Sequence, residues 1–360
     1  MTVLIDICHP AHVHLYRNVY FELKKRGHKV IVTAKETKAI VSLLQLYGID
    51  YLPMGKNTDS LLGKSLQQVR NFFHFWRIIS INKVDVGLHG MTIAWLSRIS
   101  KVKSILLDDD DDEVEPLIVK FGHPFADAIL SPADTPRKSK HKIYVNSYHE
   151  LAYLHPNRFT PDPSVLADAG VKEGEPYFIL RFNAFKAHHD VGVVGLTIEN
   201  KRRLVQYLSS KGKVFITTER NIDDEFKPYQ LTVSPEKAHS LMYYATMFVG
   251  DSQTMTSEAA VLGTPAIRCN TFVGRIHYLE EEEHKYNLTY GFRPEHSEDM
   301  FRKIEELLAM PDLKAEWQRR RQVLLADKID YSAFLTWFIE NYPESDKVMR
   351  ENPDYQWQFK

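Results

Sequence analysis

The sequence predicts an α/β protein built from two doubly wound parallel sheets. The chain opens with the apolar run Thr2–Ile7, the helical pattern Ala11–Lys25 and a second apolar run, Lys29–Thr33. A strand–helix–strand unit of this length is typical of a right-handed βαβ crossover between parallel strands. The same alternation resumes at Tyr177–Leu180. Because 360 residues suffice for two domains of ordinary size, we expect one sheet in each half.

Further elements follow this alternation. In the first half the expected strands are Asp50–Leu52, Val84–Leu88, Ser104–Leu107 and, as the last, Ala128–Leu130, and the expected helices are Lys38–Tyr47 and Thr92–Ser100. In the second half the expected strands are Lys213–Thr217 and Met247–Val249, and the expected helices are Glu199–Lys211, Ala238–Tyr244, Met255–Leu262, Glu298–Met310 and Leu313–Lys328. The segment Asn146–Pro163 is expected to be irregular, and Ile329–Tyr342 to be a last helix. Open sheets of this kind bind ligands at the carboxyl ends of their strands.

The composition is that of an ordinary soluble protein, with 44% hydrophobic and 26% charged residues. A net charge of −1 gives no electrostatic reason to expect nucleic acid as a partner. Cys8 and Cys269 are the only cysteines and lie far apart, which is typical of a reducing compartment. The sequence has no signal-peptide pattern and no run of about 18 apolar residues. We therefore expect a cytoplasmic protein with at most peripheral membrane contact.

The stretch Met247–Cys269, MFVGDSQTMTSEAAVLGTPAIRC, carries the clearest functional pattern. Its apolar run stops at Gly250, and the polar cluster Asp251–Thr254 then offers N-cap side chains to a helix that Gly263 ends. A strand, a polar turn and a helix N-terminus form an anion site, because backbone N–H groups and the helix dipole face the incoming group. Glu258 lies about one turn in, where its carboxylate can accept hydrogen bonds from ribose hydroxyls. The alternative is a capped crossover without a ligand.

Three histidines, His9, His12 and His14, lie in the first strand–helix turn. No acidic or cysteine residue with metal-ligand spacing accompanies them, so a zinc site is not expected. A histidine here suits the removal of a proton from a hydroxyl, because its pKa is ordinarily near neutral. The alternative is a histidine that is hydrogen-bonded at a helix start.

An acidic run, Asp108–Glu113, follows the expected strand that ends at Leu107. We expect Asp108 or Asp109 to serve as an acceptor-side base or hydrogen-bonding group, and the remainder to be solvated. So many carboxylates repel a diphosphate unless a cation or an acceptor amine lies between them. Whether the run binds a cation stays open.

Two further strand ends carry polar side chains. Arg181 suits a bidentate phosphate contact, and Asn183 follows it. The segment from His188 to Asp190 could supply acid–base groups or metal ligands, or form a turn in which the carboxylate orients a histidine. Glu219 lies in the turn after the strand that ends at Thr217.

The stretch Leu66–Ile81, LQQVRNFFHFWRIISI, mixes aromatic residues with Arg70 and Arg77. Because its positive charge is sparse, a buried helix or a lid is favoured. Docking at a membrane surface, which would suit a lipid-linked acceptor, is the alternative.

These residues together resemble a known superfamily. The strand–turn–helix with Asp251-Ser252, Glu258 and Gly263–Pro265 resembles the nucleotide-sugar site of GT-B glycosyltransferases and of the non-hydrolysing UDP-N-acetylglucosamine 2-epimerases. The first turn, with His12, is similar to the first βα unit of the same superfamily. More narrowly, the whole chain resembles domain of unknown function family 354, through the segments His149–Pro163, Arg181–Gly195 and Asp251–Arg268.

The resemblance implies a GT-B-like fold, with two Rossmann-like domains facing across a cleft and a C-terminal helix that crosses back. It implies an N-terminal acceptor-side domain over residues 1–165 and a nucleotide-sugar-binding domain over residues 166–330. Residues 331–360 would then pack on the first domain. A nucleotide-diphosphate sugar, UDP-linked by this resemblance, is the expected substrate, and neither a separate cofactor nor a metal is expected.

The expected function is that of a hexosyltransferase, which moves the sugar to a polysaccharide or lipid-linked acceptor. A 2-epimerase, or a nucleotide-sugar-binding protein without catalysis, is the alternative. The expected donor-site residues are Arg181, Asn183, Glu219, Asp251, Ser252, Thr254, Met255 and Glu258. The expected catalytic residues are His12, Asp108, Asp109, His188 and Asp190.

Overall fold

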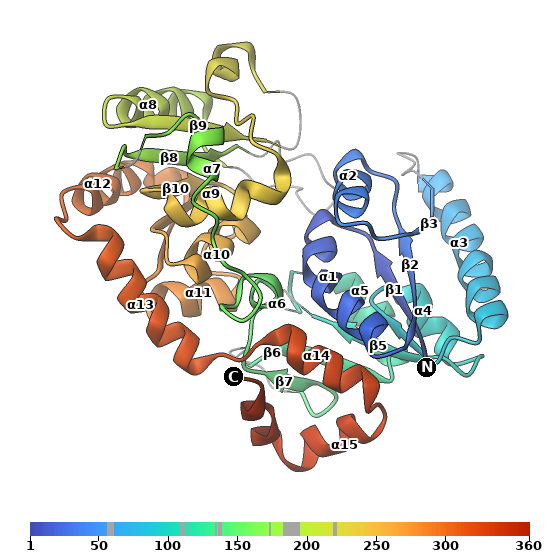
Figure 1. The fold of residues 1–360 in the computed structure, drawn as a ribbon. Coiled ribbons are helices and arrows are strands. Elements are labelled where there is room, and N and C mark those ends of the chain that lie inside the picture. The colour runs from blue at the N-terminus through green and yellow to red at the C-terminus, as the bar shows by residue number, and fades with distance from the viewer. Residues whose placement is uncertain are drawn as a thin grey trace. The chain divides into compact units, whose positions relative to one another are not determined.

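The computed structural model describes residues 1–55, 61–108, 112–114, 116–133, 135, 139–172, 174–182, 195–218 and 222–360, with side chains from residue 67 onward in the helix that begins at Leu61 (Figure 1). The chain forms two compact units. Unit 1 comprises Met1–Arg158 and Lys328–Lys360, and unit 2 comprises Phe159–Asp327.

Unit 1 contains a parallel sheet with the strand order β3-β2-β1-β4-β5-β6-β7. Its strands are β1 (Thr2–Ile7), β2 (Lys29–Ala34), β3 (Leu52–Pro53), β4 (Val86–Leu88), β5 (Lys103–Leu107), β6 (Ala128–Pro132) and β7 (Ile143–Val145). Val3 of β1 pairs with Val30 on one side and with Val86 on the other. The chain order therefore reverses between β1 and β4, and doubly wound sheets bind ligands at the carboxyl end of such a reversal.

Helices of unit 1 lie between these strands and after the last of them. They are α1 (Pro10–Lys25), α2 (Lys38–Leu46), α3 (Leu61–Asn82), α4 (Met91–Ser97), α5 (Pro116–Phe121), α6 (Leu151–Leu154), α14 (Tyr331–Glu340) and α15 (Glu344–Glu351). The start of α1 shows why a helix forms at this position. His9 is the N-cap, the Nδ1 of the His9 ring accepts from the N–H of Ala11 at 3.2 Å, and Pro10 opens the first turn. Val13, Tyr16 and Val19 then bury one face of the helix.

Near the C-terminus, helix α14 returns to the first sheet's unit and lies beside α1, as Figure 1 shows. Ser332 Oγ donates to the carbonyl of Ala152 at 2.7 Å, and Glu340 Oε1 lies 2.8 Å from His28 Nε2. The predicted return of the C-terminal helix is confirmed.

Unit 2 contains a second parallel sheet with the strand order β12-β11-β10-β8-β9. Its strands are β8 (Tyr177–Arg181), β9 (Lys213–Thr217), β10 (Met247–Gly250), β11 (Ala266–Cys269) and β12 (Thr289–Phe292). Its helices are α7 (Val165–Asp168), α8 (Ile198–Ser209), α9 (Ala238–Tyr244), α10 (Gln253–Leu262), α11 (His277–His284), α12 (Ser297–Leu308) and α13 (Leu313–Asp327). The order reverses at β8 and β10, where Arg181 pairs with Gly250.

Several sequence predictions need correction. The first half does not end at β6, because β7 adds a seventh strand. The expected strand Asp50–Leu52 is shifted to Leu52–Pro53, and the segment expected to be irregular contains α6. The last helix of the chain is α15, since α14 ends at Glu340. Helix α11 and strand β12 were not predicted.

Candidate functional site

Strand β10, a tight turn and helix α10 form the strand–turn–helix that the sequence predicts. A Cβ at Gly250 would lie 2.7 Å from the carbonyl oxygen of Arg181, so only glycine allows β8 and β10 to approach here. Ser252 is the N-cap of α10, and its Oγ accepts from the N–H of Met255 at 3.4 Å. Gly263 ends the helix with a φ of 69°.

The first turn of α10 can bind an anion. Within the described part of the chain, the backbone N–H groups of Gln253 and Thr254 have no protein acceptor, and both residues are half-buried. Arg181, the last residue of β8, lies in register with Gly250 and is 9% exposed. Its guanidinium donates to Thr217 Oγ1 at 3.1 Å. A cation and two peptide N–H groups thus lie at the carboxyl edge of neighbouring strands, where doubly wound sheets bind phosphate groups.

Glu258 follows in the second turn of α10 and is almost completely buried. Its Oε1 lies 2.9 Å from Nε2 of His239, which belongs to α9. The ring of Phe159 lies edge-on to His239, with 6.3 Å between the ring centroids. The carboxylate is therefore held in one orientation by a histidine that sequence reasoning missed.

Asp251 is fully buried behind this turn. Its N–H donates to the carbonyl of Arg181 at 3.2 Å, and its own carbonyl accepts from Asn270 Nδ2 at 2.9 Å. These bonds fix the path of the chain into α10. Other predicted residues lie outside the described residues: Asp109, Asn183, His188, Asp190 and Glu219.

In unit 1, His12 and His89 come together at the carboxyl ends of β1 and β4, where the strand order reverses. Their ring centroids are 4.1 Å apart, and the ring planes are inclined by 59°. His89 has a φ of 65°, which is uncommon for a residue other than glycine. Such local strain at a ligand-binding edge is a reason to suspect function. The sequence signal was only a His-Gly turn after a strand.

His12 lies at this strand edge but is not a strong base. Burial, followed by the rings of His89, His9 and His149, holds the pKa of His12 well below its usual range. The N–H of Cys8 approaches Nδ1 of His12 at 3.4 Å, which favours the tautomer with the proton on Nε2. In this state the neutral ring donates a hydrogen bond from Nε2.

Asp6 lies beside this pair, at the end of β1, and was not predicted. Its Oδ1 accepts from Thr33 Oγ1 at 2.8 Å, and its Oδ2 accepts from Cys8 Sγ at 3.3 Å. A Cβ at Gly90 would lie 3.0 Å from Oδ2, so the glycine leaves room for the carboxyl. Burial raises the pKa of Asp6 to about 6, against smaller opposing effects of Thr33 and Cys8. A carboxyl that titrates near neutral pH is suited to proton exchange.

The raised pKa of Asp6 predicts a pH-dependent effect of Asp6→Asn. The carboxyl has a pKa near 3.8 in the unfolded chain and about 6 in the folded one. Between these pH values the folded state binds more protons than the unfolded state, so wild-type stability falls as the pH rises and then levels off. We expect Asp6→Asn to be neutral near pH 4 and stabilising by up to about 3 kcal/mol above pH 6. Urea unfolding at several pH values measures this difference, with Asp50→Asn, an exposed carboxyl of the same unit, as the control. A pH-independent difference would contradict the assignment.

Asp108 follows β5 and is held in a buried ion-pair network. Its Oδ1 lies 3.0 Å from His123 Nε2, and its Oδ2 lies 2.7 Å from Lys142 Nζ. Burial opposes ionisation, but His123 and Lys142 outweigh it and keep the pKa of Asp108 below its ordinary value. The lowered pKa favours a positioning role for Asp108, and the expected role as a base stays a prediction.

Lys142 supplies the cation that the acidic run requires. Ligand atoms of Asp108, Asp112 and His123 all lie within 4.8 Å of one another, as in a metal site. The Lys142 ammonium, however, lies 2.7 Å from Asp108 and 2.5 Å from Asp112 Oδ1. A lysine therefore takes the position between the carboxylates, and we assign no metal to this cluster.

The sequence over residues 1–289 matches the family described as protein of unknown function, DUF354. The chain belongs to this family. MJ0665, an uncharacterized protein of Methanocaldococcus jannaschii, is 20% identical to the chain over 301 residues, which is 79% of this chain and 86% of the relative.

Solved structures resemble this DUF354 protein over nearly its whole length. The S. aureus MnaA–UDP co-structure has a TM-score of 0.67 at 13% identity and covers 95% of both chains. The Neisseria meningitidis UDP-GlcNAc 2-epimerase bound to UDP-GlcNAc has a TM-score of 0.63 at 13% identity, over 93% of this chain and 98% of that chain. Spinosyn rhamnosyltransferase SpnG complexed with thymidine diphosphate has a TM-score of 0.62 at 12% identity, over 94% of this chain and 100% of that chain. The DUF354 chain thus has the fold of GT-B glycosyltransferases and 2-epimerases.

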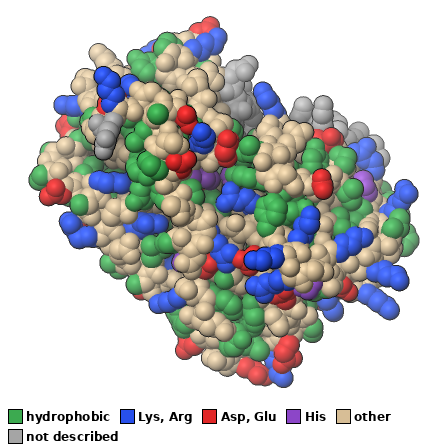
Figure 2. Space-filling model, in the orientation of Figure 1, with side chains coloured by type: hydrophobic (Ala, Val, Ile, Leu, Met, Phe, Trp, Pro, Cys, Tyr) green, Lys and Arg blue, Asp and Glu red, His purple; other side chains and the backbone are tan. Residues whose placement is uncertain are grey.

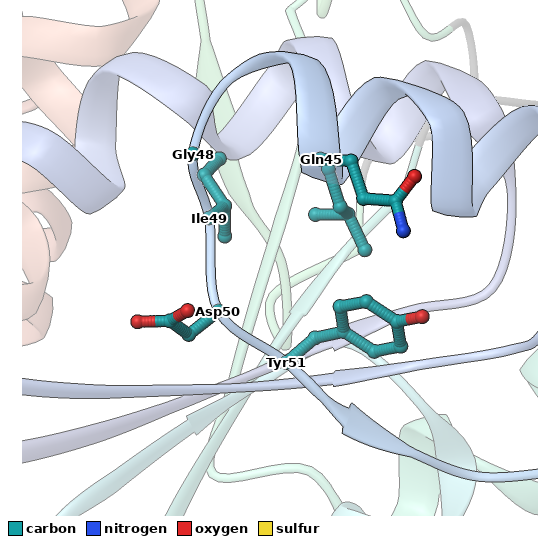
Figure 3. Close-up of a pocket in the computed structure, with 6 residues that line it drawn as sticks. Gln45, Gly48, Ile49, Asp50 and Tyr51 are labelled. Carbon is teal, nitrogen blue, oxygen red and sulfur yellow. The ribbon is translucent and has the colours of Figure 1, made fainter.

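A surface hollow of about 360 Å³ lies elsewhere in the DUF354 chain, at the carboxyl end of α2 (Figure 3). It is lined by Leu44, Gln45, Gly48, Ile49, Asp50 and Tyr51. In the close-up, the carboxylate of Asp50 points away from the ring of Tyr51, so the two polar groups do not converge. None of the candidate site residues lines it, and we assign it no role.

Proposed function

We propose that this protein transfers a sugar from a nucleotide-diphosphate donor to a hydroxyl acceptor, with the donor bound by unit 2. The observation that carries the proposal is the turn between β10 and α10, where Arg181 and the open N–H groups of Gln253 and Thr254 lie at one strand edge. Relatives of the same fold are described as complexes with UDP, UDP-GlcNAc and thymidine diphosphate.

In this proposal the diphosphate binds at the N-terminus of α10. As the bond between the anomeric carbon and the diphosphate breaks, negative charge grows on the leaving oxygen, and Arg181 and the helix N-terminus stabilise it. Glu258 accepts hydrogen bonds from the ribose hydroxyls, and His239 holds its carboxylate in place. Ser252 and Asp251 contribute by fixing the turn rather than by touching the sugar.

The acceptor hydroxyl is proposed to bind in unit 1, at the carboxyl ends of β1 and β4. His12 donates a hydrogen bond from Nε2 to the oxygen of this hydroxyl. The proton of the hydroxyl passes to the Asp6 carboxylate, whose pKa of about 6 suits a base at neutral pH. Asp108 is less suited, because its ion pairs with His123 and Lys142 lower its pKa. A polysaccharide or a lipid-linked sugar remains the proposed acceptor class.

Epimerisation at the second carbon of the sugar is the second candidate. The specific observation in its favour is Asp6, a carboxyl poised to exchange protons near neutral pH, since epimerisation requires removal and return of a proton.

Proton and phosphorus NMR of the protein with UDP-glucose and UDP-GlcNAc distinguishes the candidates. Transfer, to water or to an added acceptor, releases UDP and forms a new sugar product. Under epimerisation the phosphorus spectrum remains that of an intact UDP-sugar, and the proton spectrum gains a second set of sugar signals. Unchanged spectra, with binding of UDP intact, would contradict both and indicate a binding protein.

A further inference from the structure

Helix α3 has one buried face and one apolar face that is open to solvent. Phe75, Ile78 and Ile79 are buried and join the core cluster of unit 1 with Ile93 and Leu96. This face explains why the segment forms a helix here, because it supplies the apolar spacing of a packed surface helix. The sequence favours a buried helix or a lid, and over residues 67–82 one face of the helix is buried while the other is exposed.

The opposite face carries Val69, Phe73 and Trp76, which are 56%, 57% and 47% exposed. Steps of four and three residues place them on one side of the helix. The rings of Phe73 and Trp76 lie close together, with 6.3 Å between centroids. Ile81, 66% exposed, follows near the helix end. Exposed large apolar side chains in one row are unusual for a surface that contacts only water.

The same face is cationic. Arg70 and Arg77 are exposed between the apolar residues, and Lys83 is exposed just after the helix. The sequence of residues 61–84 contains Lys64, Arg70, Arg77 and Lys83 but no Asp or Glu. Figure 2 shows blue and green side chains along the edge of the molecule where α3 lies in Figure 1. We call Val69, Arg70, Phe73, Trp76 and Arg77 the outer face of α3.

We propose that the outer face of α3 docks the protein on an anionic lipid surface. A phenyl ring and an indole ring with its polar N–H, flanked by arginines, suit the boundary between headgroups and acyl chains. The arginines are attracted to anionic headgroups. Charge decides against a second copy of this chain as the occupant, because two such faces would bring arginine against arginine. No helix among the described residues is long and apolar enough to cross a membrane, so the contact is peripheral.

This inference does not rest on the proposed function. A protein that only binds nucleotide would still dock, and a transferase with a soluble acceptor would not need to. Docking would deliver unit 1 to a lipid-linked acceptor, which narrows the acceptor class if transfer is confirmed.

Flotation of the full chain with vesicles tests the proposal. We expect binding to vesicles of phosphatidylcholine with about 30% phosphatidylglycerol, weak binding to phosphatidylcholine alone, and loss of binding as salt rises. Phe73→Ser with Trp76→Ser should lower the partition coefficient by about tenfold or more. Arg70→Glu with Arg77→Glu should lower it by about fivefold or more per arginine.

Matched controls are Phe21→Ser on α1, 45% exposed, and Arg302→Glu on α12, whose side chain is 77% exposed. Both should bind vesicles like the wild type, and circular dichroism should show that every variant is folded. Equal flotation of wild type and folded outer-face variants would overturn the proposal. So would a concentration-dependent dimer that Trp76→Ser abolishes, since the face would then bind a second copy.

Discussion

Replacing Glu258 with glutamine is expected to weaken the binding of a nucleoside diphosphate by on the order of 10- to 100-fold. Glutamine keeps one acceptor oxygen but removes the negative charge, and a hydrogen bond to a charged group contributes about 1.5–3 kcal/mol in a buried site. Glu258 is nearly buried, and its carboxylate is held by His239 at 2.9 Å, so little rearrangement can compensate. Isothermal titration of wild type and variant with the same diphosphate measures the effect.

The matched control is Glu283→Gln in the same unit. Glu283 is a half-buried carboxylate whose Oε2 accepts from the N–H of Gly291 at 2.8 Å, and it lies in no proposed ligand contact. A loss of affinity in Glu283→Gln equal to that in Glu258→Gln would point to a general disturbance of unit 2. Unchanged affinity in folded Glu258→Gln would remove Glu258 from the donor site.

Replacing Lys142 with methionine is expected to destabilise unit 1 by roughly 3–5 kcal/mol. The side chain of Lys142 is 4% exposed and that of Asp108 is 7% exposed, so the variant leaves a buried carboxylate whose remaining partner among the described residues is His123. Chemical unfolding monitored by circular dichroism gives the free energy. Adding Asp108→Asn to Lys142→Met should restore much of the loss, because the uncompensated charge is then removed.

The ion pairs of Asp108 also determine whether stability rises or falls as the pH is lowered. The pKa of Asp108 is lower in the folded state than its ordinary value, so its stabilising contribution is present at neutral pH and is lost as the pH falls toward the folded pKa. In Lys142→Met this acid-side loss should shrink. If the losses of unfolding free energy in the two single variants simply add in the double variant, and Lys142→Met loses as much stability in acid as the wild type, then Lys142 and Asp108 do not interact.

The fold could be predicted because its signals are local. Strands such as β1 and β10 are short apolar runs, and α10 has its N-cap Ser252 and its terminal Gly263 within one stretch. Strand β7 was missed because its three residues stand in a polar surrounding and are defined by pairing with β6. Helix α15 was missed for a similar reason: it is strongly polar, and tertiary contact of Met349 decides its place.

The site could be predicted only where one segment carries it. Gly250, Ser252 and Glu258 belong to a single strand–turn–helix, so their placement in it could be inferred from spacing. His239 pairs with Glu258 from the preceding helix, and Lys142 pairs with Asp108 across 34 positions of the chain. No local sequence pattern predicts such pairs, because the fold, and not their spacing in the sequence, brings their segments together.

Calorimetric titration of the full chain with UDP, GDP, CMP and TDP tests the central claim, that unit 2 binds a nucleoside diphosphate at the start of α10. The account predicts a response to one diphosphate above the others, with stabilisation of the fold by about 2.7 kcal/mol when the ligand is at 100 times its Kd. Flat titrations with all four ligands, on protein shown to be folded, would contradict it and leave a chain that keeps the fold without the donor site.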